Sequence, residues 1–145
     1  MNFSGPDMAG NHFELRDLRG EPVLVTFWAS WCPSCQRETA VIDRITERFG
    51  NMKVVGVSMD KNRRQLEGFL KRSGIGWQQV YADKPGQKGW DNPIAKYYGV
   101  ESIPCSFLVN RHGDVASAGL RGEQEITAAI GELLLPADDD SYAAR

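Results

Sequence analysis

A hydrophobic strand passes directly into an amphipathic helix near the start of this chain, and two cysteines lie at the junction. The apolar run at residues 22–28 predicts a buried strand, and from residue 33 to 49 apolar side chains recur at helical spacing. Cys32 and Cys35 therefore lie at the beginning of the helix. Thiols at this spacing can close a disulfide across one turn, and the free N–H groups and dipole of a helix start favour a thiolate. The pair predicts a redox centre.

Metal binding is the alternative use of two neighbouring cysteines. A zinc site would need a second pair of ligands at suitable spacing. The remaining candidates are Cys105, His12 and His112, and no two of them form a compact pair. A soft metal such as copper held by the cysteine pair itself, in a chaperone or a redox-inert binding module, stays open as an alternative. We expect no bound metal, and no cofactor besides the redox-active disulfide.

Length and charge place the chain among ordinary globular domains and exclude several other classes. The chain has 145 residues and a formal net charge of −2, and its basic residues are scattered, which argues against a nucleic-acid partner. No segment has the length and hydropathy of a transmembrane span, and the first residues do not resemble a signal peptide. We expect one domain over residues 1–136 and a disordered acidic tail over residues 137–145.

Strand and helix patterns alternate along the whole domain. Strands are predicted at residues 12–15, 22–28, 53–59, 77–81, 105–109 and 115–118. Helices are predicted over residues 33–49, from a cap at Asp60 or Asn62 to an end at Gly74, around 94–98, and over 123–135. The last helix is expected to bury one apolar face, made of Ile126, Ile130, Leu133 and Leu134. This order predicts an α/β fold with a central mixed sheet.

The order of these motifs resembles that of a known family. The segment Phe-Trp-Ala-Ser-Trp-Cys-Pro-Ser-Cys at residues 27–35, with Ile103-Pro104 before a hairpin and a final helix, resembles thioredoxin-fold proteins. More narrowly, it resembles the TlpA/ResA-like bacterial thiol–disulfide oxidoreductases, which are related to AhpC/TSA proteins. Further matches are residues 17–20, Glu38 and residues 98–100, so the resemblance spans about residues 3–135. It implies a thioredoxin fold with helices on both faces of the sheet and a cis-proline loop opposite the CxxC motif.

The resemblance implies disulfide exchange with protein thiols, more in the direction of a reductant. Cys32, as the more exposed sulfur, would attack a substrate disulfide, and the less exposed Cys35 would then attack Cys32 and release the reduced substrate. Pro33 suits the first helical position, where its missing N–H costs nothing. A peroxidase of the peroxiredoxin group is a weaker alternative, because the Pro-x-x-x-[Thr/Ser]-x-x-Cys pattern of that group is absent.

Glu38 is the candidate acid of the site. It falls within the apolar stripe of the helix, so burial would raise its pKa and let it exchange a proton with Cys35. The alternative is a glutamate in the first turns, with its head group in water and stabilised by the helix dipole. The resemblance favours the first role. The buried aspartate of thioredoxin would fall at Thr26, which cannot titrate, and this leaves Glu38 as the one nearby candidate acid.

The substrate-binding surface is predicted around the sulfur of Cys32. The backbone of Ile103, beside a cis-Pro104, would pair with an extended substrate as an added strand. Trp31 and Pro33 would supply apolar surface, whereas Trp28 is expected in the core. Cys105 stands where the family more often has threonine. It is either a small buried hydrophobe or a third thiol that could trap Cys35 or help bind a soft metal.

Partners and location come from the resemblance alone. It implies a membrane or thioredoxin-type electron donor, a monomer, a role in cytochrome c maturation, and a place in the periplasm or on the outer face of the membrane. We expect this chain to be a domain cut from a precursor with a signal peptide or anchor. The direction of electron flow stays open, because reduction potentials in this fold run from about −270 to about −120 mV.

Overall fold

A five-stranded mixed sheet forms the centre of the computed structural model, which describes residues 1–135. The strand order is β5–β4–β3–β6–β7, in which β3 (Val23–Trp28), β4 (Lys53–Ser58) and β5 (Gln78–Val80) run parallel. Strand β6 (Cys105–Val109) is antiparallel to β3, and β7 (Val115–Leu120) is antiparallel to β6. The predicted α/β class and mixed sheet are therefore confirmed. The predicted tail at residues 137–145 lies outside the described residues.

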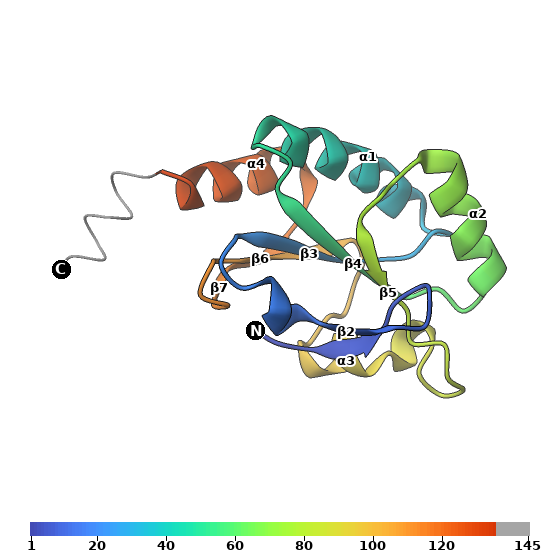
Figure 1. Cartoon of the computed structure of the whole chain (residues 1–145). Coiled ribbons are helices and arrows are strands. Elements are labelled where there is room, and N and C mark those ends of the chain that lie inside the picture. The colour runs from blue at the N-terminus through green and yellow to red at the C-terminus, as the bar shows by residue number, and fades with distance from the viewer. Residues whose placement is uncertain (136–145) are drawn as a thin grey trace.

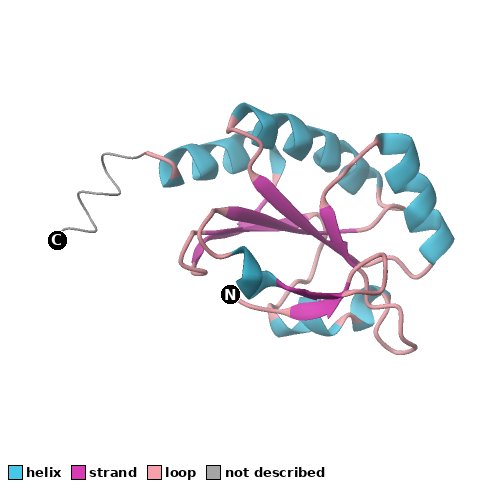
Figure 2. Ribbon diagram, in the orientation of Figure 1, coloured by secondary structure: helices cyan, strands magenta, loops and turns pink. Residues whose placement is uncertain are grey.

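Helices cover both faces of the sheet, as expected (Figures 1 and 2). One face carries α1 (Pro33–Arg48), α2 (Arg63–Ser73) and α4 (Gly122–Leu133). The other carries the short helix α3 (Pro93–Tyr97) and an N-terminal hairpin of β1 (Ser4–Pro6) and β2 (His12–Glu14). Short 3₁₀ turns occupy η1 (Leu15–Leu18) and η2 (Gly89–Asp91). Within residues 1–135, none of the helices combines the length and hydropathy that crossing a membrane requires.

Strand β3 is the most enclosed element of the molecule. All six of its residues are buried, as expected for a central strand with neighbours on both sides and cover on both faces. Trp28, predicted to lie in the core, is fully buried and donates its Nε1–H to Gln79 Oε1 at 3.0 Å. Gly56 on β4 makes room for this pair, because a Cβ there would lie 2.8 Å from Trp28 Nε1.

An aliphatic core lies between the sheet and the helices α1 and α4. It contains Ile42 and Ile45 of α1, the predicted inward residues Ile126 and Ile130 of α4, and strand residues that include Leu24 and Leu108. Helix α4 ends at Leu133, earlier than predicted, and Leu134 is its C-terminal cap. The expectation that Leu134 would lie on the buried face was therefore wrong, because the helical spacing stops before it and its side chain is exposed.

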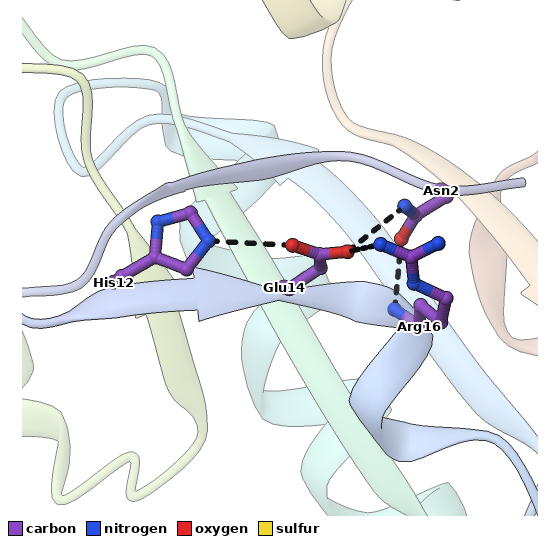
Figure 3. Close-up of polar contacts among 4 residues, drawn as sticks. All are labelled: Asn2, His12, Glu14 and Arg16. Atoms are coloured by element: carbon purple, nitrogen blue, oxygen red, sulfur yellow. Dashed lines mark hydrogen bonds and ion pairs between the residues drawn. The ribbon is translucent and has the colours of Figure 1, made fainter.

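The N-terminal hairpin includes a strand, β1, that the sequence pattern did not reveal. Phe3 and Phe13 bury its apolar side against the sheet, while polar contacts hold its outer side. Glu14 accepts hydrogen bonds from His12 (3.3 Å), Arg16 and Asn2 (3.5 Å), and Figure 3 shows their convergence on its carboxylate. These bonds, first of all that of His12, lower the pKa of Glu14. Asn2 also accepts from the Arg16 backbone N–H, so the cluster closes the hairpin.

Candidate active site

The two cysteines lie where β3 passes into α1, as the sequence predicts. Cys32 is the N-terminal cap of α1, and its Sγ accepts a hydrogen bond from the backbone N–H of Cys35 at 3.3 Å. Pro33 occupies the first turn, where its missing N–H leaves no hydrogen bond unmade. The thiol at residue 32 therefore takes the place of the serine or aspartate that usually caps a helix, and it satisfies one of the free N–H groups.

The environment of Cys32 favours its thiolate. Burial opposes ionisation, but the hydrogen bonds from Cys35 and Ser34 outweigh it and hold the pKa of the Cys32 thiol below its ordinary value. Ser34 Oγ lies 3.3 Å from the sulfur. Ser34 carries no charge, so it cannot stabilise the thiolate as an ion. Its hydroxyl contributes through a hydrogen bond instead.

Cys35 has the opposite tendency. Its side chain is fully enclosed, while 6% of Cys32 remains exposed, so the predicted order of exposure is confirmed. Burial raises the pKa of Cys35, and the hydrogen bond with Cys32 and the charges of Cys32 and Glu38 raise it further. A proton on Cys35 is thus held firmly until something removes it.

Glu38 points into the protein, one turn beyond Cys35. It is buried, and this burial raises its pKa, as predicted, so the alternative of a water-exposed head group was wrong. Both carboxylate oxygens accept the backbone N–H of Gly122, at 3.0 and 3.2 Å, and this bond opposes the rise. A raised pKa makes the Glu38 carboxylate a stronger proton acceptor than an exposed glutamate.

The Ile103–Pro104 peptide bond is cis, as the resemblance implied. Residue 105 begins β6 and pairs with Phe27 near the carboxyl end of β3, so the loop before it lies at the same end of the sheet as the CxxC motif. Ile103 and Cys105 are half-buried and pack against the core cluster that includes Cys32 and Cys35. Pro104 is buried.

Two tryptophans expose apolar surface. Trp31, directly before Cys32, is 46% exposed and leaves a large ring in solvent beside the sulfur, with Pro33 exposed after it. Trp90 in η2 is 45% exposed. Gly89 packs so close to Lys61 that a Cβ would lie 2.7 Å from the lysine Cε, so η2 adjoins the loop after β4.

Asp60 is a site residue that the sequence analysis missed. It is fully buried after β4, and its carboxylate accepts hydrogen bonds from Ser30 N–H (3.1 Å), Ser30 Oγ (2.6 Å) and Ser58 Oγ (2.7 Å). Asn62, not Asp60, caps α2, because its side chain accepts from Gln65 N–H. Glu38 is therefore not the one buried acid near the motif. A buried strand followed by Ser-x-Asp was the signal that could have indicated it.

Thr26 occupies the position of the aspartate in thioredoxin. It is buried in β3, and its Oγ1 accepts a hydrogen bond from Ser106 Oγ at 3.0 Å. Two hydroxyls thus satisfy each other where thioredoxin places a titratable group. Among the described residues, no three histidine, cysteine or acidic side chains are grouped so that they could hold a metal ion.

Comparison with known proteins agrees with this geometry. The profile of the AhpC/TSA family matches residues 1–118. The chain belongs to the AhpC/TSA family. It is 30% identical to the thiol–disulfide oxidoreductase ResA of Bacillus anthracis over 125 residues, which cover 85% of this chain and 68% of the relative.

Solved structures show the same fold. A thiol–disulfide oxidoreductase from Bacteroides fragilis superposes with a TM-score of 0.79 at 27% identity, covering 92% of this chain and 98% of the other. A putative thiol:disulfide interchange protein DsbE from Chlorobium tepidum superposes with a TM-score of 0.73 at 27% identity. The superposition covers 90% of this chain and 94% of the other. The thioredoxin fold and the ResA-like relationship are therefore confirmed, and this member of the family is a thiol–disulfide oxidoreductase.

Proposed function

We propose that the protein reduces disulfides of partner proteins through Cys32 and Cys35, with Glu38 as the proton acceptor. The observation that carries this proposal is the contrast between the two sulfurs: Cys32 Sγ accepts the Cys35 N–H and stays slightly exposed, whereas Cys35 is fully buried. Cys32 is the favoured thiolate and the more exposed of the pair, while Cys35 is a buried thiol that keeps its proton. A pair of this kind is suited to attack in a fixed order.

The Cys32 thiolate attacks one sulfur of the substrate disulfide, and the other substrate sulfur leaves as a thiolate. Glu38 accepts the Cys35 proton, and the Cys35 thiolate attacks the Cys32 sulfur of the mixed disulfide. This closes the Cys32–Cys35 disulfide and expels the second substrate sulfur. The substrate gains two electrons and, from Cys35 and solvent, two protons.

The substrate would bind across the loop at residues 102–104 and the ring of Trp31. Extended segments pair with backbone groups through main-chain hydrogen bonds, and neighbouring apolar surface adds affinity. Support comes from the position of this loop at the end of β3, beside the motif, and from the exposed tryptophan. Each catalytic cycle leaves the pair oxidised, so a membrane or thioredoxin-type electron donor must reduce it again. No cofactor beyond the two sulfurs takes part.

Pathway and location follow from the relatives and are part of the proposal. The similarity to ResA and to a putative DsbE supports an extracytoplasmic protein that reduces specific partners, with cytochrome c maturation as the process. A monomer suffices for this chemistry, because one chain supplies both sulfurs and the acid.

Two cysteine variants test the order of attack. Cys32→Ser is expected to abolish the protein's acceleration of insulin reduction in the presence of dithiothreitol, because the attacking sulfur is gone. Cys35→Ser is expected to accumulate a mixed disulfide, visible as a mass adduct that reductant removes. Cys105→Ser is the control and is expected to keep wild-type turnover. Equal residual turnover in the Cys32 and Cys35 variants would refute the mechanism.

A further inference from the structure

Arg121 and Gly122 together contact two parts of the site that the proposed mechanism uses in different steps. It joins β7 to α4, and its guanidinium donates a hydrogen bond to Ser102 Oγ at 2.6 Å. Ser102 directly precedes Ile103-Pro104. The next residue, Gly122, donates its N–H to both oxygens of Glu38. One two-residue segment therefore contacts both the substrate loop and the acid.

The backbone of this segment explains how it reaches in two directions. Arg121 is extended, with φ −145° and ψ 137°, whereas Gly122 has φ +82° in the left-handed region. Glycine adopts this conformation without the Cβ penalty of other residues. The turn aims the Gly122 N–H at Glu38 while the Arg121 side chain extends to the loop. Glu125 accepts the Arg121 N–H at 3.4 Å and holds the segment against α4.

Arg121 also places a positive charge near the reacting groups. The titratable groups around Glu38 are Cys35 on its own helix, Arg121 at the junction and Glu125 on α4. Burial raises the pKa of Glu38, Arg121 opposes the rise and Glu125 adds to it. The same guanidinium opposes the rise that burial causes in the pKa of Cys105. Arg121 thus acts on both sides of the cis-proline loop.

We propose that Arg121 is a positioning residue that couples the substrate loop to the acid. Its bond to Ser102 holds residues 102–104 beside the CxxC motif, and its backbone keeps Gly122 on Glu38. A substrate strand that docks on the loop then meets the two sulfurs and the proton acceptor in one fixed arrangement. This inference rests on the proposed function.

The first test is a comparison of two disulfide substrates in steady state. The variants are Arg121→Gln, Arg121→Lys, Ser102→Ala and the double variant Arg121→Gln/Ser102→Ala. Loss of one hydrogen bond to a charged group is expected to raise the KM for insulin about fivefold in Arg121→Gln and in Ser102→Ala. The double variant is expected to match the single variants, because all three lose the same contact. The KM for hydroxyethyl disulfide, which is too small to pair with the loop, is expected to change by less than about twofold.

The control variant is Arg44→Gln. Arg44 is an exposed arginine of α1 that pairs with Glu123 of α4 at 3.3 Å, so its removal costs the same charge without touching the loop. It is expected to leave both KM values unchanged. Wild-type turnover of insulin tests the proposed function by itself, whereas the variant ratios test the role of Arg121.

A pH profile supplies a readout that a purely structural role would not change. Arg121 opposes the rise in the pKa of Glu38, so in Arg121→Gln the pH at which decay of the Cys32 mixed disulfide speeds up is expected to move to a higher value. Arg121→Lys, which keeps the charge, and Ser102→Ala, which keeps the arginine, are expected to retain the wild-type profile. An unchanged insulin KM in both single variants, or an equal rise for both substrates, would overturn the proposal. Should Arg121→Gln fail to fold, the insulin KM values of Arg121→Lys and Ser102→Ala decide the proposal.

Discussion

Cys32 and Cys35 are three positions apart, and a single hydrogen bond contributes to the contrast between them. The Cys35 N–H donates to the Cys32 sulfur, where negative charge is stabilised, while Cys35 itself lies a turn deeper among apolar side chains. Burial raises the pKa of Cys35, and charge on Cys32 raises it further. Because each sulfur affects the ionisation of the other, the second step of the reaction needs its own proton acceptor.

Glu38→Gln tests that acceptor. The amide can still accept from Gly122 N–H but cannot take a proton, so decay of the Cys32 mixed disulfide is expected to slow at least about tenfold at neutral pH. Quenched-flow mass analysis of the mixed disulfide across a pH series measures this. Glu47→Gln, which removes an exposed carboxylate of α1, is the matched control. A pH profile identical to that of the wild type would assign Glu38 a structural role at the start of α1.

The same substitution predicts a change in stability with pH. Burial raises the folded-state pKa of Glu38 above 4.5, so the folded protein favours the protonated form and loses stability as pH rises above that value. Glu38→Gln lacks this loss. Its free energy of unfolding, relative to wild type, is therefore expected to increase between about pH 4 and about pH 8. Urea unfolding at the two pH values measures it, with Glu47→Gln on the exposed face of α1 as control.

At the scale of elements, the connection between β3 and α1 is held from outside itself. Asp60, at the end of β4, binds both the N–H and the hydroxyl of Ser30, and Gln36 on α1 donates to the Ser30 carbonyl at 2.7 Å. The segment that leads to Cys32 is thus fixed by neighbours on both sides. Its conformation depends on a tertiary contact rather than on local preference.

Asp60→Ala is expected to loosen this connection. It leaves the donors of Ser30 and Ser58 buried without their acceptor, and we expect the free energy of unfolding to fall by about 3 kcal/mol. The rate of Cys32 alkylation is expected to change with it, because the sulfur loses its fixed position. Urea unfolding and iodoacetamide kinetics measure the two effects. Asp83→Asn, an exposed carboxylate that pairs with Arg63, is expected to alter neither.

Gly56 on β4, which makes room for the Trp28–Gln79 pair, gives a second prediction at this scale. Gly56→Ala would place a Cβ 2.2 Å from Gln79 Oε1 and 2.8 Å from Trp28 Nε1, which breaks the hydrogen bond between those buried side chains. We expect a loss of about 2–3 kcal/mol in unfolding free energy. Thermal unfolding followed by tryptophan fluorescence measures it. Gly76→Ala, where a Cβ would meet nothing within 4 Å, is the control.

At the scale of the whole molecule, four separate segments meet at one end of the sheet. These are the β3–α1 junction, the loop before β6, the β7–α4 junction and the end of β4. Together they enclose the two sulfurs, so the reduction potential is a property of the assembled site. The stabilised thiolate of Cys32 favours the reduced pair, while the buried thiol of Cys35 resists ionisation.

Equilibration of the Cys32–Cys35 pair in graded thiol–disulfide buffers measures this potential. For a reductant we expect a reduction potential near or below about −250 mV. A potential near about −120 mV would mark an oxidant and reverse the proposed direction of electron flow. A pair that never closes into a disulfide would instead favour the soft-metal alternative. Stoichiometric copper binding by the reduced protein, compared with Cys32→Ser, would then decide between them.

The sequence by itself determined the elements that carry the chemistry, because their signals are local. A continuous apolar run followed by helical spacing placed Cys32 at the cap of α1, and the apolar stripe placed Glu38 toward the core. The resemblance supplied the cis peptide at Ile103-Pro104. The positions of Cys32 and Glu38 depend on residues within one or two turns of each other, so periodicity and motif spacing suffice to find them.

What the tertiary structure decided is which distant polar groups meet. Asp60 with Ser30, and Arg121 with Ser102, are separated by 30 and 19 positions, and no periodic pattern links the members of either pair. The hairpin strand β1 is another case, since three residues containing glycine and proline form a strand only because β2 pairs with them. Packing of the sheet against its helices brings these groups together. Burial then makes each hydrogen bond matter, because a polar group deprived of water must find its partner within the fold.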